Sequence, residues 1–186
     1  MSSELTRSSW TIKDEAVLAE LISLMDLNPT DTALLRDLHV HARTAAPQMA
    51  QAFYTRLMAR SETSEYFVGK PMAALHGTIG DWFVDLFSGT YDVEYARKRL
   101  QIGSVHVKIG LPVRYPLAMM DVILEYGQQL VAHSSSPTQA LRAFHKVLAL
   151  DLAIFNQAYE DNQLKHLAEL VGGERLARIV LAGITS

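Results

Sequence analysis

The sequence predicts an all-α fold, and three observations support this prediction. Apolar residues recur every three or four positions through most of the 186-residue chain, whereas the alternating pattern of a β-strand is almost absent. Helix-starting runs such as Asn28-Pro29-Thr30-Asp31 and helix-ending glycines such as Gly89 separate the apolar segments. The connections between these segments are short. Together these features are typical of one domain of packed helices.

Three helices are expected in the first half of the chain, over residues 32–43, 47–60 and 71–88. Pro47 and Pro71 stand at the first positions of the second and third of these helices. Proline suits this position because its φ angle is already helical and because a first-turn N–H has no partner within the helix. Both prolines are therefore predicted to open helices.

Three longer apolar segments follow, and they predict helices over residues 92–106, 113–133 and 137–171. The run Gly110-Leu111-Pro112 ends the first of them, because glycine tolerates the left-handed conformation after a helix and proline cannot continue one. Gly172-Gly173 interrupts the pattern after the last helix.

The chain is expected to form one domain with an extension at each end. Residues 1–20 have the pattern of an amphipathic N-terminal extension, and residues 21–171 hold the helices of the domain. Residues 172–186 resume an apolar pattern that has little left to pack against. This is typical of the start of a linker towards an output domain that lies outside these residues, or of a C-terminal tail.

The composition excludes several kinds of protein. The net charge is −3, from 17 basic and 20 acidic residues without long runs of either sign, so nothing indicates a nucleic-acid or membrane surface. The chain has no cysteine, which excludes disulfides, thiolate–zinc sites, iron–sulfur clusters and a cysteine nucleophile. No stretch of about 18 apolar residues occurs, and the N-terminus lacks the apolar segment of a signal peptide. We therefore expect a soluble, cytoplasmic protein.

Common enzyme and metal motifs do not occur in the sequence. It contains no GxGxxG, GxxxxGK[ST], HExxH or GxSxG run, and its carboxylate residues are scattered as on solvated helix faces. The best local metal-ligand spacing is His39-Val40-His41. Residues two apart point to different sides of a helix, so this pair is not expected to bind a metal ion.

His106 differs from the other histidines in its surroundings. Gly103 lies about one turn before it and Gly110 about one turn after it, so small residues on its face would let a flat macrocycle approach the helix. Neutral imidazole is a natural axial ligand of haem iron, which needs one strong bond from the protein. Taken alone, the pattern also fits a helix end with a surface or core histidine.

Longer runs around His106 resemble a known family. The run Arg99-Leu100-Gln101-Ile102-Gly103-Ser104-Val105-His106-Val107-Lys108-Ile109-Gly110-Leu111-Pro112 is similar to the proximal-histidine signature of globin-coupled sensors and protoglobins. The runs Phe53-Tyr54-Thr55-Arg56-Leu57, Leu86-Phe87-Ser88-Gly89-Thr90-Tyr91-Asp92 and Leu148-Ala149-Leu150-Asp151-Leu152 resemble further segments of the family. The similarity covers most of the chain in the family's order. It implies a globin-like helical sandwich with an N-terminal helical extension and without a D helix.

The resemblance implies a b-type haem and assigns roles to residues of this chain. His106 becomes the proximal ligand of the haem iron, and Tyr54 becomes the distal hydroxyl that donates a hydrogen bond to bound O₂. Leu75 and Thr78 fall on the distal helix, where Leu75 would gate solvent access and Thr78 would support the polar network. For Tyr54, Leu75 and Thr78, a plain packing role remains the alternative.

The rest of the expected pocket is less closely defined. Its expected walls are Phe53, Phe67, Trp82, Val105, Ile109 and Tyr115, although aromatic residues at such spacings also occur in ordinary cores. His76 could reach the iron after a modest helix rotation, but it is expected to face solvent because it lies about 100° round the helix from Leu75. Lys98, Arg99 and Lys108 are all candidates for binding the haem propionates. Pro116 departs from the aromatic pair usual in the family, which leaves the pocket edge undefined.

The resemblance favours a sensor domain that binds O₂, and also CO and NO, reversibly at ferrous haem and that signals through a homodimer. The apolar helices over 113–133 and 138–171 would supply the dimer interface, although the core of a monomer would use the same residues. The domain itself would not be an enzyme, since any output enzyme would lie outside these residues. A haem enzyme, such as a nitric oxide dioxygenase or peroxidase-like globin, and a haem-free helical signalling module remain the alternatives.

Overall fold

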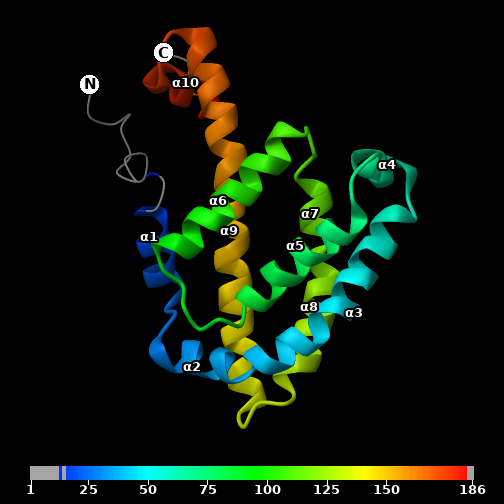
Figure 1. The fold of residues 1–186 in the computed structure, drawn as a ribbon. Coiled ribbons are helices and arrows are strands. Elements are labelled where there is room, and N and C mark those ends of the chain that lie inside the picture. Colours follow the sequence, from blue (N-terminus) through cyan, green and yellow to red (C-terminus); the bar gives the residue numbers. More distant parts are fainter. Residues whose placement is uncertain (1–12, 14–15, 184–186) are drawn as a thin grey trace.

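The computed structural model describes residue 13 and residues 16–183, and it shows helices, turns and loops but no strand within them (Figure 1). The helices are α1 (Ala16–Met25), α2 (Pro29–Asp37), α3 (His39–Met58), α4 (Ser61–Ser64), η2 (Glu65–Phe67), α5 (Met72–Asp85), α6 (Val93–Lys108), α7 (Arg114–Ala118), α8 (Met120–Val131), α9 (Pro137–Val171) and α10 (Glu174–Leu181). Residues 68–71 lead directly from η2 into α5. The predicted all-α fold is confirmed.

The 35-residue helix α9 is the axis of the fold. Helices α1, α2, α6, α8 and α10 pack against it, whereas α3 packs against α5 and α8. Figure 1 shows the C-terminal part of α9 extending beyond this bundle, with α10 at its end. Helices α3, α5 and α6 carry most of the predicted site residues, and the loop that follows Asp85 joins α5 to α6.

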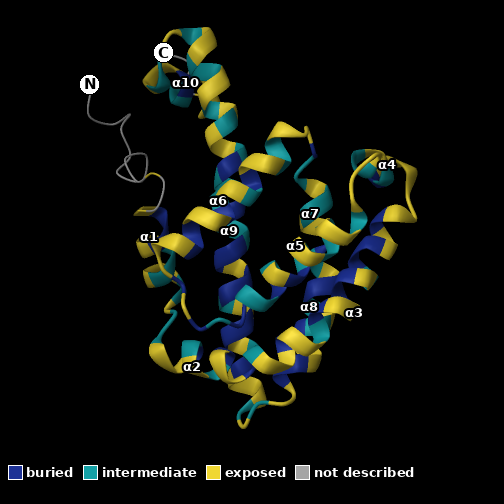
Figure 2. Ribbon diagram, in the orientation of Figure 1, coloured by how far each residue is buried: buried dark blue, intermediate teal, exposed yellow. Residues whose placement is uncertain are grey.

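The apolar core lies where α3, α5 and α8 meet the first part of α9. Figure 2 shows that buried residues are concentrated there, whereas α10 and the end of α9 are largely exposed. Phe87, which is fully buried, contacts Phe83 edge-on and stacks on Phe144 of α9, with ring centroids 5.5 Å and 5.4 Å apart. Within the described residues, no helix is both long and apolar enough to cross a membrane.

The start of α2 follows the signals in its sequence. Asn28 accepts hydrogen bonds from the backbone N–H groups of Thr30 and Asp31, and Asp31 accepts one in return from the Asn28 N–H. This reciprocal pair satisfies N–H groups that have no partner within the helix. The helix therefore begins at Pro29, three residues before the predicted start. Lys146 of α9 forms a 2.7 Å ion pair with Asp31 and so ties this helix end to the axis of the fold.

The prediction that Pro47 opens a helix is wrong, because α3 runs from His39 to Met58 with Pro47 inside it. The ring of Pro47 is exposed, so it does not disturb the buried face of the helix. That face continues across the proline, with Ala42 and Ala46 before it and Met49 and others after it. Burial on both sides outweighs the hydrogen bond that a proline removes from a helix interior.

The single helix predicted over 113–133 is two helices, α7 and α8, which meet at Met119. Pro116 lies early in α7, where proline is tolerated. At the joint the Val122 N–H bonds to the Met119 carbonyl three residues before it, which tightens the turn. Met119 is 6% exposed, so the tightened turn places its side chain in the core.

Both predicted extensions lie partly outside the described residues. Of residues 1–20, residue 13 and residues 16–20 are described, and the latter belong to α1, which buries Val17 and Leu18. Of residues 172–186, those up to 183 are described. They contain α10 after Gly172, whose φ of 85° gives α9 the expected left-handed end. Lys13 forms a 2.7 Å ion pair with Glu174 of α10.

Candidate functional site

His106 lies in the last turn of α6, close to the predicted end of this helix. Asp92 caps the start of α6 by accepting a hydrogen bond from the Tyr95 N–H, and Gly110, with a φ of 70°, follows the last turn as predicted. The Nδ1 atom of His106 is 2.8 Å from the carbonyl oxygen of Ile102, one turn earlier. A carbonyl oxygen only accepts hydrogen bonds, so Nδ1 must carry the proton. The Nε2 atom of the neutral ring therefore keeps its lone pair.

The surroundings of His106 favour this neutral ring. Burial lowers the pKa of His106 below its ordinary value of 6.5, and the hydrogen bond with the Ile102 carbonyl only partly opposes this effect. Phe155 of α9 contacts the imidazole edge-on at 5.3 Å and fixes it from the other side. None of the described residues forms a hydrogen bond with Nε2. A neutral imidazole with one nitrogen held by a carbonyl and the other free is the usual arrangement of a metal-binding histidine.

Tyr54 is a buried residue of α3, and three aromatic rings contact it. It is 7% exposed, and Phe53 and Phe67 contact it edge-on, each with ring centroids 5.5 Å away. The imidazole of His76 stacks on its face at 4.9 Å, with an angle of 9° between the ring planes. Burial raises the pKa of Tyr54 to about 12. The phenol is therefore protonated at neutral pH and can donate a hydrogen bond.

The hydroxyl of Tyr54 has no hydrogen-bond partner among the described residues. The other deeply buried tyrosines differ, because Tyr91 donates to the Leu86 carbonyl at 2.8 Å and Tyr95 donates to Asp151 at 2.6 Å. Every completely buried side-chain nitrogen or oxygen within the described residues has a partner. The Tyr54 oxygen therefore reaches accessible space. A buried phenol that keeps a free donor beside such a space is suited to binding a polar ligand.

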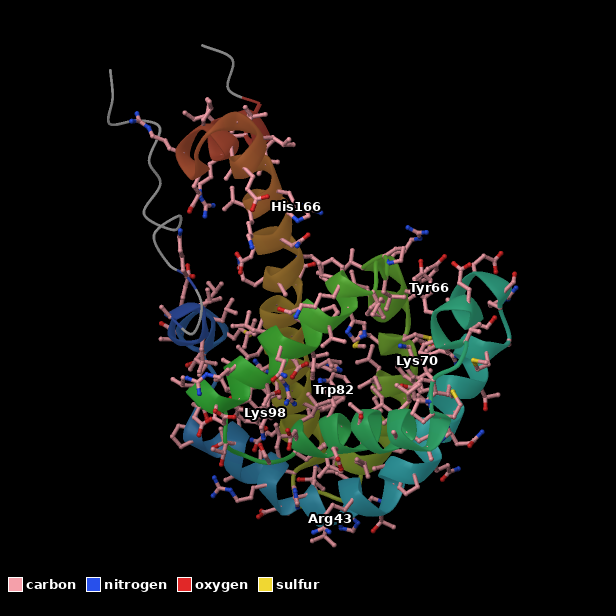
Figure 3. All side chains as sticks on the ribbon, turned by 45° about the horizontal axis from the view of Figure 1, so that its top comes forward. Arg43, Tyr66, Lys70, Trp82, Lys98 and His166 are labelled. Atoms are coloured by element: carbon pink, nitrogen blue, oxygen red, sulfur yellow. The ribbon has the colours of Figure 1, made fainter. Side chains whose placement is uncertain are left out.

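The remaining predicted site residues lie on the elements expected of them. Leu75, Trp82, Phe67 and Tyr115 are half-buried and Phe53 is buried, whereas Val105 and Ile109 on α6 are 49% and 45% exposed. Figure 3 shows Trp82 lying between α5 and α6. Large apolar side chains exposed beside a histidine such as His106 are what a site for an apolar ligand requires.

Two of these residues have other partners. Thr78 is exposed, and its hydroxyl donates a 3.0 Å hydrogen bond to the Ala74 carbonyl on the same helix. Tyr115 contacts Tyr66 and the Arg114 guanidinium rather than Tyr54. The structure therefore brings Phe53 and Phe67 to Tyr54 directly, and it gives Thr78 and Tyr115 separate local contacts.

The chain matches the family model described as protoglobin over residues 14–165. The chain belongs to the protoglobin family. This confirms the family predicted from the runs around His106 and Tyr54. The protoglobin is 25% identical over 187 residues to the heme-based aerotactic transducer HemAT of Halobacterium salinarum. That match covers 92% of this chain and 38% of the transducer, so the chain spans less than half of its relative's length.

Two solved structures show the same fold. The globin domain of the Geobacter sulfurreducens globin-coupled sensor superposes with a TM-score of 0.71 at 29% sequence identity, and the match covers 76% of this chain and 96% of that one. The globin domain of E. coli DosC, in a ferric crystal form, gives a TM-score of 0.62 at 17% identity, with 77% and 99% covered. The predicted globin-like helical arrangement is confirmed.

The expectation that His76 of this protoglobin faces solvent is wrong. Helix α3 packs beside α5, and His76 of α5 contacts Tyr54 of α3. His76 is therefore half-buried, with one ring face on Tyr54. The rotation of about 100° from Leu75 is as expected, but it brings one face of the ring onto Tyr54 of α3, so His76 is only partly exposed to solvent.

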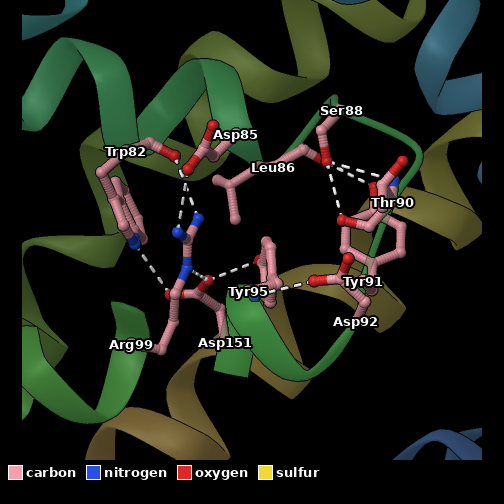
Figure 4. Close-up of polar contacts among 10 residues, drawn as sticks. All are labelled: Trp82, Asp85, Leu86, Ser88, Thr90, Tyr91, Asp92, Tyr95, Arg99 and Asp151. Carbon is pink, nitrogen blue, oxygen red and sulfur yellow. Dashed lines mark hydrogen bonds and ion pairs between the residues drawn. The ribbon is translucent and has the colours of Figure 1, made fainter. Parts of the chain in front are cut away.

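Arg99 is not available to haem propionates, because it lies in a buried ionic cluster (Figure 4). Its Nε donates to Asp151 of α9 at 2.5 Å, its Nη1 donates to Asp85 at 3.1 Å, and its guanidinium covers the ring of Tyr95 at 3.9 Å. Trp82 also donates to Asp151, at 2.8 Å. Burial and the nearby charge of Asp151 raise the pKa of Tyr95 well above its ordinary value. Arg99 is thus a structural residue.

Of the other two propionate candidates, Lys98 and Lys108 are both exposed on α6. Figure 3 shows Lys98 on the outer side of this helix.

Gly103 also differs from its expected role, because its Cα faces α9 rather than a ligand. A Cβ atom at this position would lie 2.6 Å from the Phe155 carbonyl oxygen and 2.7 Å from the Ala158 Cβ. Gly103 therefore lets α6 approach α9 closely.

Sequence reasoning missed Phe155, which fixes His106, and Asp151, which joins three helices. Asp151 did leave a signal, because it is a single acidic residue within the apolar run 148–152. A lone carboxylate in such a run is buried and needs partners. Phe155 left none, since a phenylalanine in a buried helix is ordinary. His39 and His41 prove to have separate surroundings, and His41 stacks on His133 at 4.7 Å.

Proposed function

We propose that this protoglobin is a haem-based gas-sensor domain in which His106 binds the iron and Tyr54 faces the bound gas. One pair of observations carries the proposal. A neutral, half-buried histidine with a free Nε2 and a buried tyrosine with a free hydroxyl come from α6 and α3 of a globin fold. The family membership and the heme-based transducer among its relatives support the same reading.

The residues present fit a b-type haem. His106 supplies the neutral imidazole that haem iron accepts as an axial ligand. Val105 and Ile109 beside it, with Leu75, Ile79 and Trp82 on α5, supply apolar surface for the macrocycle. The chain has no cysteine, so a covalent thioether attachment as in c-type haem is not available. Lys98 and Lys108 remain the two candidates for the propionates.

When bound, haem supplies a ferrous iron that takes up O₂, CO or NO reversibly at an open position. His106 would hold the iron through Nε2, because the Ile102 carbonyl keeps its ring in the tautomer that leaves this atom free. Tyr54 donates a hydrogen bond to a polar ligand from the α3 side, and its pKa of about 12 keeps the proton in place.

A relative that is a transducer favours a sensor role over an enzyme role. The relative HemAT is a transducer, and this chain corresponds to 38% of it. We propose that α10 and the residues after it lead towards an output domain and that the homodimer forms through α7, α8 and α9, the segments 113–133 and 138–171. In that arrangement the domain itself is not an enzyme. The cytoplasmic location and the dimer stay predictions.

The first experiment tests whether His106 binds the iron. The purified chain should bind about one haem per chain, and His106→Gly should lose the haem or its five-coordinate spectrum. Added imidazole should restore the spectrum, because it replaces the missing ligand. His166→Ala is the matched control, since His166 is exposed on the projecting part of α9 (Figure 3). Unchanged haem retention and an unchanged Soret band in His106→Gly would refute the assignment.

The second experiment tests the donor. Tyr54→Phe keeps the ring and removes only the hydroxyl, which is worth about 1–3 kcal/mol to a charged acceptor. O₂ should therefore dissociate about tenfold to a hundredfold faster, while the CO dissociation rate changes little. Thr78→Val should add little to this effect, because the Thr78 hydroxyl already bonds to the Ala74 carbonyl. Equal O₂ dissociation rates in wild type and Tyr54→Phe would show that the donor lies elsewhere.

A further inference from the structure

A cavity of about 590 Å³ lies between α3 and α5, open to solvent. Its lining includes His39, Arg43 and Pro47 from α3, and His76, Asp81 and Asp85 from α5. Figure 3 shows Arg43 on the outer side of α3, at the edge of the molecule. Most of the polar lining is charged, so the cavity is a wet one.

His76 separates this cavity from Tyr54. It is part of the cavity wall, and Tyr54 is not. One face of the His76 imidazole covers the face of the Tyr54 ring at 4.9 Å. The other two rings around Tyr54, Phe53 and Phe67, approach it edge-on. His76 is therefore the ring that holds the phenol flat and that lies between it and the water of the cavity.

We infer that His76 is a positioning residue for Tyr54, which holds the phenol hydroxyl in place for O₂ and shields it from the outer cavity. The inference rests on the proposed function, because Tyr54 must be the donor for its position to matter. His76 itself needs no contact with the gas or the iron in this role. Its contribution is a flat, rigid ring that fills the space between the backbone of α5 and the Tyr54 ring.

This role has consequences that differ from those of iron ligation. Loss of the ring opens the wall and lets the phenol tilt, so the hydrogen bond to O₂ weakens. Loss of an aromatic contact of this kind should make O₂ dissociate about two- to tenfold faster. CO accepts almost no hydrogen bond, so its dissociation rate should change less than twofold. A phenylalanine at position 76 should serve as well as histidine.

The first arm of the test does not depend on haem. The ring signal of ¹³C-labelled Tyr54, assigned by its loss in Tyr54→Phe, is followed by NMR in the purified full chain between pH 8 and 11. In wild type, with a Tyr54 pKa of about 12, the signal should hardly move. In His76→Ala the cavity water reaches the phenol, and the signal should titrate closer to the ordinary value of 10.0. In His76→Phe the Tyr54 signal should again hardly move over this pH range.

The second arm uses the haem-loaded protein. His76→Ala should release O₂ about two- to tenfold faster with little change for CO, and His76→Phe should restore the wild-type rate. In the Tyr54→Phe background, His76→Ala should have no further effect, because both changes act through one hydroxyl. If His76→Ala does not fold, His76→Leu replaces it with the same expected directions.

Several results would overturn the inference. One is that neither the Tyr54 signal nor the O₂ dissociation rate responds to His76→Ala. Another is that the effects of Tyr54→Phe and His76→Ala on the O₂ dissociation rate add in the double variant. A third is that His76→Phe does not restore the wild-type O₂ dissociation rate. A low-spin ferric spectrum that only His76 variants convert to high-spin would show instead that His76 binds the iron. If the chain binds no haem at all, the proposed function fails, while the NMR arm still decides whether His76 covers Tyr54.

Discussion

Replacing Gly103 by alanine should destabilise the protein, although alanine is the better helix former. The new Cβ atom would lie 2.6 Å from the Phe155 carbonyl oxygen, which is about 0.8 Å short of the 3.4 Å at which ordinary contact begins. The obstacle is backbone of α9, so it cannot turn aside as a side chain would. Helix α6 must therefore move away from α9. His106 lies on α6 one turn later and contacts Phe155 itself, so this displacement reaches the site.

A contact of 2.6 Å with backbone falls in the upper part of the range for overpacking, so it lowers the free energy of unfolding by about 2–3 kcal/mol, and the helix propensity of alanine offsets about 1 kcal/mol of this loss. The net loss of about 1–2 kcal/mol corresponds to a Tm lower by about 2–8 °C in a chain of this length. Thermal unfolding followed by circular dichroism measures the change, and the rate of haem transfer to an apo-globin acceptor should rise. These expectations follow from the contact at position 103 alone.

Gly77→Ala is the matched control, because Gly77 lies inside α5 and a Cβ atom there would meet nothing within 4 Å. This variant should gain about 0.5–1 kcal/mol from helix propensity. The two glycine substitutions should therefore shift Tm in opposite directions. If Gly103→Ala is as stable as wild type, or if both substitutions raise Tm, α6 and α9 are not in the close contact described here.

Three further predictions use the same structure. Asp151→Asn removes the buried one of the two carboxylates that pair with Arg99, and because Asp85 remains, the free energy of unfolding should fall by less than the cost of a fully unpaired buried charge, about 3–5 kcal/mol; adding Arg99→Met should recover part of the loss, and denaturant titration that finds less than about 1 kcal/mol would contradict the buried cluster. Pro47→Ala gives the Arg43 carbonyl an intrahelical N–H and should raise stability by up to about 3 kcal/mol in the same assay, whereas an unchanged midpoint would mean that α3 does not continue through position 47. Because burial lowers the pKa of His106, the unfolded chain takes up its proton first as the pH falls, so the haem-free protein should lose stability below about pH 6.5 until the folded-state pKa is passed; His106→Gln should remove that part of the pH dependence, and identical slopes in the two proteins would contradict it.

The helical fold could be predicted because it depends on local signals, whereas His106 and Tyr54 received their roles from the resemblance to a family. Gly110 ends α6 after His106 as expected, since a left-handed residue there follows from local chemistry. Tyr54 was found through a run that resembles a family. Pro47 was misread because a local rule for proline competes with the burial of residues on both sides of it, and burial depends on partners that a sequence does not display.

The contacts between helices were the part that sequence reasoning could not reach. His76 was placed in solvent because a helical wheel gives the direction of a side chain but not what lies in that direction. The sequence groups Arg99 with two exposed lysines, because its partners Asp85 and Asp151 are 14 and 52 residues away along the chain. Only the packing of α5, α6 and α9 separates these three basic residues into one structural arginine and two free lysines.

The shared carboxylate of Asp151 also restricts how this domain can move. Its donors come from α5 and α6, and the carboxylate itself belongs to α9. Sliding α6 along α9 would break the bonds from Tyr95 and Arg99 at once, so these three helices behave as one rigid body at the level of this cluster. Any displacement of His106 relative to α9 would therefore have to occur on the C-terminal side of this cluster. The nearest joint is the turn at Gly110, which is followed by the Leu111 carbonyl that Tyr159 holds at 2.9 Å. The turn after His106 is thus joined to the far half of α9 by a hydrogen bond that lies outside the Asp151 cluster.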